Sequence, residues 1–404
     1  MYNNIIRFMI MRSDFMENWL DLFTIFSIRE TGEREKYNTD EEILNKLQSG
    51  EYNLVIDQAR YPLNSLSSIF ESYNLHPDYQ RNKVWDLSRK SKLIESLIIN
   101  VPIPPIFLYE IDYNRFEVMD GLQRISTIID FFDDKFKLKD LEIWPELNGK
   151  RFSELLPEFQ NSIKRRYLSA SIVLKESNVE REKENDLKKI VFERLNTGGI
   201  KLSQQEIRNA LNSGELNDLI NKIGDTNKNF LLSWNYPKSM KQIEKDIDRM
   251  DNREMVLRFF AYKDSLVNEV RKGTRTTLDM YAEKGSKFNE EQTKKLEIYF
   301  VKTLELANLL FGTEAFNKKE GAKPEKMIYD TVMLACSKLV DNDEFSKVIK
   351  KKSQINYHKN NDLKNNYFEK HKELFNGKYT SLSKVEERYM EFYLYMIDHI
   401  IEGE

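Results

Sequence analysis

The fold depends on the stretch Val118-Met119-Asp120-Gly121-Leu122-Gln123-Arg124, in which an expected strand runs through Asp-Gly into an expected helix. Because glycine adopts backbone conformations closed to other residues, the chain can turn sharply at Gly121. The first N–H groups of the helix have no partner within it and point beyond the end of the strand. The stretch therefore predicts an anion site. Arg124 offers a planar fork for phosphate, Gln123 can donate or accept, and Asp120 can hold a divalent cation or orient a water.

The same residues also fit a simple capped helix. Aspartate is a favoured N-cap residue, and arginine is usually exposed. In that alternative Asp120 only caps the helix and Arg124 lies on the surface. The residues alone leave both interpretations open.

Two strands and a helix are expected around this stretch. Residues 106–109 and 115–119 are expected strands, joined by the turn-forming Asp112-Tyr113-Asn114. From Asp86 to Asn100 the leucines and isoleucines follow a helical stripe that Asp86 can cap. The proline-rich residues 101–105 end this helix, because proline removes a donor and disfavours helical geometry in the preceding residue.

A third strand is expected over residues 169–174, and a helix ending near Leu195 leads to the turn Asn196-Thr197-Gly198-Gly199. Ser203 and Glu206 follow with the spacing of a capping box. Beyond residue 216 no alternating strand pattern remains, and segments around 253–264, 290–311 and 385–401 are expected helices. The Lys/Asn-rich residues 341–376 are expected to form loops or exposed helices.

These elements predict an α+β protein. We expect a peripheral N-terminal arm at residues 1–36, a mixed α/β domain at residues 37–215, and a mostly α-helical domain at residues 216–404. The 404 residues can bury a sizeable core, and 40% hydrophobic with 32% charged residues is typical of a soluble globular protein.

Composition excludes several classes of protein. A net charge of -3 gives no general affinity for nucleic acid, although a local basic patch such as Lys164-Arg165-Arg166 remains a candidate beside the plainer interpretation of a solvated helix end. The single cysteine, Cys336, forbids an internal disulfide and a cysteine-based zinc site. Charged residues interrupt the apolar segment 5–28, so we expect neither a membrane span nor a signal peptide, and we expect a cytoplasmic protein.

Two further segments carry polar side chains suited to a ligand. Gln80, Arg81 and Lys83 lie just before the helix that Asp86 caps. Arg194 and Asn196 lie at the Gly-Gly turn, whose backbone can approach a ligand closely. Solvated cations and an ordinary connector are the respective alternatives.

Together these segments resemble the N-terminal domain family of the GmrSD type IV restriction endonucleases, which is related to the ParB and sulfiredoxin fold. The resemblance rests on short pieces in a shared order, which are Tyr79-Gln80-Arg81…Trp85, Leu93-Ile94-Glu95-Ser96-Leu97, Val101-Pro102-Ile103-Pro104-Pro105-Ile106-Phe107-Leu108, Asp120-Gly121-Leu122-Gln123-Arg124 and Phe192-Glu193-Arg194-Leu195-Asn196-Thr197-Gly198-Gly199 with Leu202-Ser203 and Glu206. It spans roughly residues 53–210, and residues 252–261 resemble the helical continuation in family members.

The resemblance implies binding and hydrolysis of a nucleoside triphosphate, with Mg²⁺ or another divalent cation, at the Asp-Gly-Gln-Gln-Arg motif. It assigns catalytic roles to Asp120, Gln123 and Arg124. Asp120 is also the expected metal ligand. Phosphate binding is assigned to Gly121 and to a set of residues outside the motif, which are Gln80, Arg81, Arg194, Asn196, Thr197 and Gly198. This chain has Leu122 where the family usually has Gln, which leaves no amide for a role at that position.

The resemblance also implies action on DNA in restriction and defence against phage. Full-length relatives carry a C-terminal His-Asn-His nuclease, of which only Asp398-His399-Ile400 is similar here. We therefore expect a separate nuclease partner or cleavage by the ParB-like domain itself. The alternative from another class is a non-enzymatic, nucleotide-gated DNA-binding or scaffold module.

Overall fold

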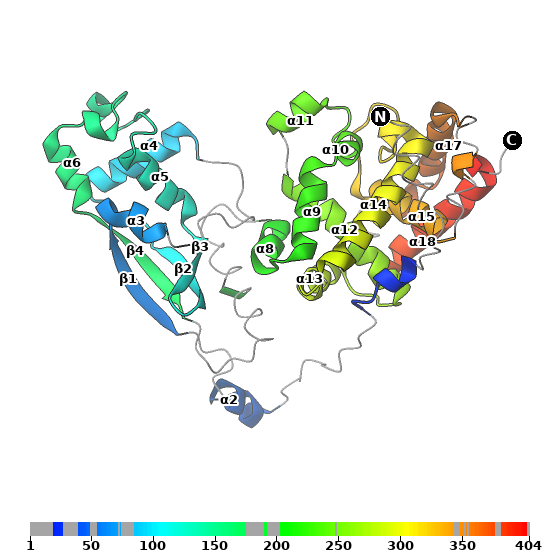
Figure 1. Ribbon diagram of the computed structural model, residues 1–404, viewed down its shortest axis with the longest axis horizontal. Helices are drawn as coiled ribbons and strands as arrows, with labels where there is room; N and C mark the ends of the chain where they lie inside the picture. The colour runs from blue at the N-terminus through cyan, green and yellow to red at the C-terminus, as the bar shows by residue number, and fades with distance from the viewer. Residues whose placement is uncertain are drawn as a thin grey trace. The chain divides into compact units, whose positions relative to one another are not determined.

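The structure is a computed structural model, which describes residues 19–26, 39–48, 55–71, 73, 85–174, 190–191, 203–246, 249–342, 348–350, 353, 355–375 and 381–401. The chain divides into two compact units (Figure 1). One, the sheet unit, runs from Arg34 to Leu211. The other, the helical unit, combines residues 1–33 with residues 212–404. The boundary at residues 211 and 212 lies close to the expected one at residues 215 and 216.

The described part of the sheet unit contains one four-stranded sheet with the order β1-β4-β2-β3. Its strands are β1 (Ile56–Pro62), β2 (Ile106–Asp112), β3 (Arg115–Asp120) and β4 (Tyr167–Val173). β1 pairs antiparallel with β4, and β2 pairs antiparallel with β3 and parallel with β4. The three expected strands are therefore present. The edge strand β1 was not predicted, because its sequence has no alternating apolar pattern.

One face of the sheet, the inner face, carries the core of this unit. Ile106, Leu108, Val118, Leu168 and Ile172 point into it and are buried. Four helices cover it, which are α3 (Leu66–Phe70), α4 (Leu87–Ile98), α5 (Leu122–Phe132) and α6 (Pro157–Lys164), and they gather on one side of the sheet in Figure 1. The unit also contains α2 (Asp40–Gln48).

The expected cap of α4 is present. Asp86 has extended backbone geometry, and its Oδ1 accepts the N–H of Arg89 at 2.8 Å. The expected capping box is present too, because Glu206 Oε2 accepts the N–H of Ser203 at 2.5 Å and Ser203 Oγ accepts the N–H of Glu206 at 3.3 Å. Helix α8 (Gln204–Leu211) starts there. Local sequence chemistry thus fixes both helix starts.

The opposite, outer face of the sheet is covered only in part. Tyr109, Met119 and Val173 form a small buried cluster on it with Val191 and Ile207. The side chains of β1 and of the first half of β4 are largely exposed on this face.

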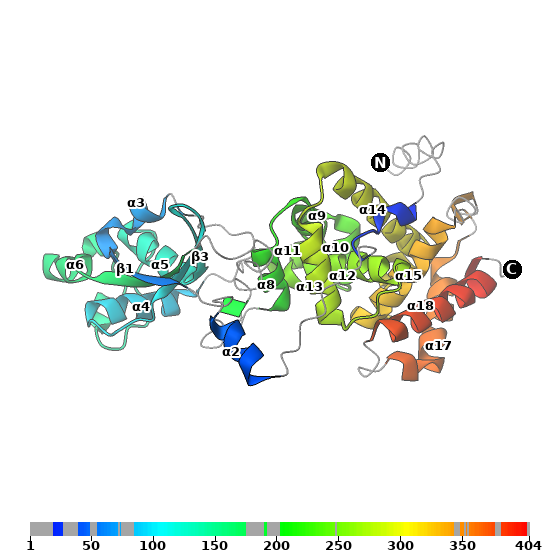
Figure 2. The same cartoon turned by 90° about the horizontal axis from the view of Figure 1, so that it is seen from below.

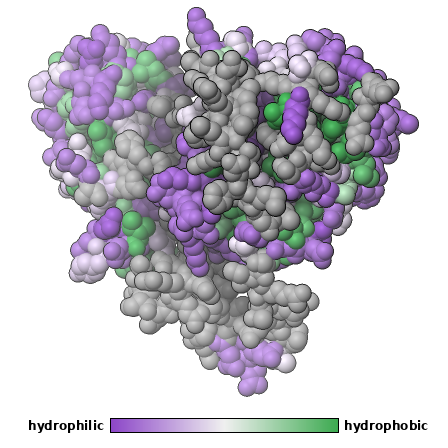
Figure 3. All heavy atoms as spheres, turned by 45° about the vertical axis from the view of Figure 1, so that its right-hand side comes forward, coloured by the Kyte–Doolittle hydropathy of each residue, from purple (hydrophilic) through white to green (hydrophobic). Residues whose placement is uncertain are grey.

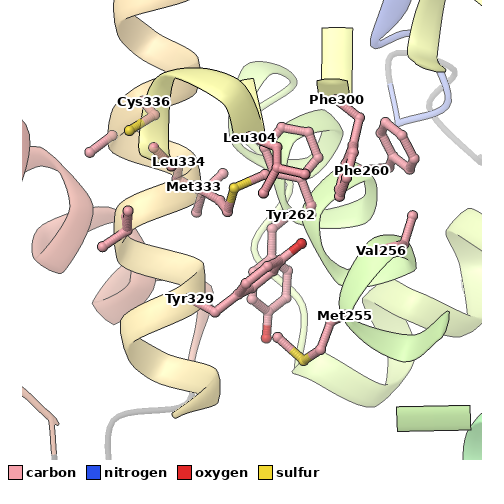
Figure 4. Packing of buried hydrophobic residues seen from close by; sticks show 14 of the residues in the cluster. Met255, Val256, Phe260, Tyr262, Phe300, Leu304, Tyr329, Met333, Leu334 and Cys336 are labelled. Atoms are coloured by element: carbon pink, nitrogen blue, oxygen red, sulfur yellow. The ribbon is translucent and has the colours of Figure 1, made fainter. Parts of the chain in front are cut away.

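The helical unit is built around one large apolar core (Figure 4). Its helices are α9 (Glu215–Thr226), α10 (Lys228–Trp234), α11 (Met240–Asp246), α12 (Arg249–Val267), α13 (Thr274–Gly285), α14 (Glu290–Phe311), α15 (Lys326–Asp341), α17 (Tyr357–Lys370) and α18 (Leu382–Met396), followed by a π-helical turn, η9 (Ile397–Ile401). Figure 2 shows the same elements from below. The sequence predicted helices at α12, α14 and α18, and the fold class is α+β with a helical C-terminal part.

The described part of the N-terminal segment, residues 19–26, packs into this core. Phe23, Ile25 and Phe26 are at most 4% exposed. The carboxylate of Asp264 on α12 accepts the N–H groups of Ile25 and Phe26, both at 3.0 Å. A buried carboxylate that satisfies two backbone donors holds the segment in place.

The Lys/Asn-rich region is more buried than its composition predicts. Helix α17 buries Tyr367 and Phe368, and Lys364 is fully buried with its Nζ donating to the carbonyl oxygen of Glu314. The expectation of an exposed helix holds for one face of α17, whereas its other face is buried, because Asn360, Asn361 and Lys364 donate to backbone carbonyl groups of residues 310–314.

Among the coloured residues of Figure 3, hydrophilic ones are the more common, and the hydrophobic ones form small separate groups. Within the described residues, no helix has the length and apolar character needed to cross a membrane.

Candidate phosphate site at the Gly121 turn

The turn between β3 and α5, which we call the Gly121 turn (Asp120 to Arg124), requires glycine. Gly121 has φ +101°, in the left-handed region. A Cβ at this position would lie 2.4 Å from Ile106 Cγ2 on β2. The lack of a side chain therefore serves the backbone conformation and the close packing of the turn on β2. The expected strand-to-helix turn is in place.

Arg124 lies on the first turn of α5 and is only 9% exposed. Its Nη2 donates to Asp120 Oδ2 at 2.5 Å, and its Nη1 donates to the carbonyl oxygen of Pro104 at 2.6 Å. The guanidinium therefore ties the end of β3 to the proline-rich run before β2. A guanidinium carries more N–H groups than these two contacts use, so it keeps donors for another acceptor.

Asp120 is the exposed member of this pair, with 50% of its side chain accessible. The N-cap position of α5 is held by Gly121, and no side chain caps this helix. The simple alternative, with Asp120 as the cap and Arg124 on the surface, is wrong. The N–H groups of Leu122 and Gln123 have no carbonyl one turn earlier in the helix, and they give the start of α5 the partial positive charge of a helix N-terminus, beside the paired charges of Arg124 and Asp120.

Gln123 joins a third segment to the turn. Its Oε1 accepts the backbone N–H of Trp85 at 3.1 Å, immediately before α4. The guanidinium of Arg89 lies 5.8 Å from the centre of the Trp85 ring. Gln123 thus holds the chain that leads back toward residues 80 and 81. Leu122, at the position where the family usually has an amide, is partly buried and packs on the core of the sheet unit.

Glu95 on α4 anchors residues 142–144 through its carboxylate. It is 6% exposed, and its Oε1 accepts the N–H groups of Ile143 at 2.8 Å and Trp144 at 2.9 Å. Oε2 accepts the N–H of Glu142 at 3.3 Å. A glutamate on the apolar stripe of α4 could have indicated this contact, because a buried carboxylate needs hydrogen-bond donors.

Six of the predicted phosphate-binding residues lie outside the described residues, so the structure does not place them. They are Gln80, Arg81, Arg194, Asn196, Thr197 and Gly198. Asp120, Gly121, Gln123 and Arg124 lie together at the Gly121 turn. What the sequence did not reveal is that Pro104 and Trp85 meet them through backbone groups.

A divalent cation would find one exposed carboxylate at the turn. Within the described residues, no group of three His, Cys, Asp or Glu side chains could hold a metal ion. Mg²⁺ commonly binds through one or two carboxylates together with substrate phosphates and waters, so Asp120 fits that mode and does not form a closed protein cage.

A pocket of about 330 Å³ lies elsewhere, in the helical unit. It is lined by Trp19, Asp21, Leu22 and Thr24 and by the first residues of α14, and none of the predicted site residues lines it. His399, of the segment similar to a His-Asn-His start, lies in η9 against the ring of Tyr395.

Comparison with known families gives one match. Residues 65–213 match the family described as GmrSD restriction endonuclease, N-terminal domain, which confirms the resemblance stated from the motifs. The match covers less than half of the 404-residue chain and lies almost wholly in the sheet unit. Comparisons with curated proteins and with solved structures found no match.

Proposed function

We propose that the domain at residues 65–213, as a GmrSD-type N-terminal domain, binds and hydrolyses a nucleoside triphosphate at the Gly121 turn and couples this to DNA restriction in defence against foreign DNA. DNA is the proposed partner, and the cytoplasm is the proposed location. DNA cleavage would come from a separate nuclease subunit or from the sheet unit itself.

The observation that carries the proposal is the nearly buried guanidinium of Arg124 beside the half-exposed carboxylate of Asp120, at the start of α5. Oriented N–H groups and a fixed cation favour phosphate oxygens. The cost of burying an arginine is met here by Asp120 and by the Pro104 carbonyl, so the positive charge is already in position before a ligand arrives.

Each motif residue receives a role from its contacts. Arg124 binds phosphate oxygens through the donors that Asp120 and Pro104 leave unused. Asp120 orients the attacking water, or holds Mg²⁺ that neutralises phosphate charge. Gln123 fixes the start of the α4 region by accepting the backbone N–H of Trp85. The reaction is transfer of the terminal phosphoryl group to water, giving a nucleoside diphosphate and phosphate.

Phosphate release from each of the four common nucleoside triphosphates, measured with Mg²⁺, tests the proposal. Asp120→Asn should abolish turnover, and Arg124→Lys should weaken triphosphate binding. Asp133→Asn is the matched control, because Asp133 lies at the other end of α5 with 44% of its side chain exposed. Equal turnover in wild type, Asp120→Asn and Arg124→Lys would remove the site assignment.

A non-enzymatic switch is the second candidate. It is favoured by Leu122 and by the engagement of Gln123 and Arg124 in contacts that hold the fold. It predicts triphosphate-dependent DNA binding without phosphate release. Turnover that depends on Asp120 would exclude it.

A further inference from the structure

The uncovered half of the outer sheet face presents a polar surface with one aromatic ring. Gln58 and Arg60 of β1 lie opposite Ser171 and Ser169 of β4, and Tyr167 begins β4. Because alternate residues of a strand point to the same face, these side chains share the outer face. We call the set Gln58, Arg60, Tyr167 and Ser169 the exposed strand face, since all four are exposed.

Tyr167 is the central residue of this surface. Tyr167 is 51% exposed, and the guanidinium of Arg60 lies 5.1 Å from the centre of its ring. A cross-strand Arg–Tyr pair contributes to sheet stability. A pair that only stabilised the sheet could be buried. Here about half of Tyr167 is exposed to solvent, on the face of the sheet opposite the helices.

The charge of the exposed strand face is positive. Within the described residues of β1 and β4, the one carboxylate is Asp57, and alternation places it on the inner side with Ala59 and Tyr61. Two members of the basic run before β4, Lys164 and Arg166, contact the helix-covered side of the sheet. Lys164 Nζ lies 5.5 Å from the ring centre of Phe152, in the inner core, and Arg166 Nη2 donates to Ser162 Oγ on α6.

This combination fits single-stranded DNA. An exposed ring on a flat sheet can stack on a base, an arginine beside it can contact the phosphate, and amide and hydroxyl groups can bond base edges. Duplex DNA conceals the faces of its bases, so it cannot use the ring in this way.

The exposed strand face lies toward the same end of the sheet as the Gly121 turn. Ile106 pairs with Ala170, and Asp120 pairs with Phe107, so the start of β2 lies between the first half of β4 and the Gly121 turn. We propose that the exposed strand face binds single-stranded DNA, with a base stacked on Tyr167 and a phosphate contacted by Arg60. This identifies a DNA contact surface for the restriction function proposed above and rests on that function.

Anisotropy of a labelled oligothymidylate, titrated with the full chain at several salt concentrations, tests the proposal. Tyr167→Ala should weaken binding roughly ten-fold or more. Tyr113→Ala is the matched control, because Tyr113 is 87% exposed at the β2–β3 hairpin and should leave binding unchanged. Arg60→Ala should reduce the salt dependence of log K by about 0.7, the loss of one single-strand phosphate contact.

Two more variants keep the test independent of folding. Tyr167→Phe preserves the ring and should bind as wild type does, whereas Ser169→Glu removes no packing and should weaken binding through repulsion. Absence of oligothymidylate binding by wild type, equal loss in Tyr113→Ala and Tyr167→Ala, or a change only in oligomeric state on Tyr167→Ala would each overturn the proposal. The last result would identify the face as an interface between copies of the chain.

Triphosphate binding measured on the same proteins separates this proposal from the preceding one. Tyr167-dependent DNA binding without triphosphate binding would retain the strand surface and reject the nucleotide site. Triphosphate hydrolysis with DNA binding unaffected by Tyr167→Ala would do the reverse.

Discussion

Replacement of Gly121 by alanine should destabilise the sheet unit more than the same replacement at Gly149. Both glycines have positive φ, +101° and +83°. A left-handed conformation costs an alanine about 1–2 kcal/mol at either position. At Gly149 nothing lies within 4 Å of the new Cβ, whereas at Gly121 it would lie 2.4 Å from Ile106 Cγ2 and 2.9 Å from Ile106 Cβ. Overpacking of this kind adds about 1–3 kcal/mol.

The comparison therefore predicts a loss of about 2–5 kcal/mol for Gly121→Ala against about 1–2 kcal/mol for Gly149→Ala. Because the two units need not unfold together, the assay is hydrogen exchange read by mass spectrometry on peptides from β2 and α5, with urea unfolding as a second measurement. Gly121→Ala should cost less in an Ile106→Ala background than in the wild-type protein, because that background lacks the Cγ2 atom against which the new methyl group would clash. Equal losses at the two glycines, or no coupling with Ile106, would refute the steric argument.

Three further changes test other parts of the structure. Glu95→Gln should cost about 1–3 kcal/mol, because its amide oxygen can still accept the N–H groups of Ile143 and Trp144 but its NH2 group then faces the N–H of Glu142. The exposed Glu154→Gln should cost little in the same urea unfolding experiment. Asp264→Ala should speed hydrogen exchange across residues 19–26, because it leaves the N–H groups of Ile25 and Phe26 buried without an acceptor, and unchanged exchange there would contradict the anchoring role. Burial lowers the pKa of Lys364 from 10.5 to about 7, so the unfolded chain binds the proton more tightly. Stability should therefore rise with pH from about 7 toward 10.5, by up to about 1.4 kcal/mol per pH unit, and this contribution should be lost as the pH falls through 7. Lys364→Met should flatten that slope in unfolding measured across this pH range, and a slope that persists would contradict the assignment.

Elements with strong local signals were predictable from the sequence. Asp86 caps α4 and Ser203 with Glu206 caps α8, because both interactions are made within one turn of the chain. The ion pair of Asp120 with Arg124 is close in sequence, but it crosses the turn from β3 to α5 and so depends on the left-handed backbone of Gly121.

Features that depend on distant partners were not predictable. β1 carries exposed side chains at Ile56, Asp57 and Gln58, so its strand character comes from pairing with β4. Likewise, the sequence around Lys364 gives no sign that a carbonyl 50 residues away will accept its ammonium group. The burial of Arg124 could not be predicted either, because one acceptor of its guanidinium is the carbonyl oxygen of Pro104, 20 residues earlier.

The discontinuous helical unit has a consequence for the order of synthesis. The N–H of Ile25 finds its acceptor on Asp264, 239 positions later, and the whole sheet unit lies between them. Chains emerge from the ribosome in order, and domains generally fold as units. The sheet unit can therefore fold before α12, the partner of residues 19–26, has been synthesised. A nascent chain that ends before Asp264 would therefore leave Phe23, Ile25 and Phe26 without the partners that bury them.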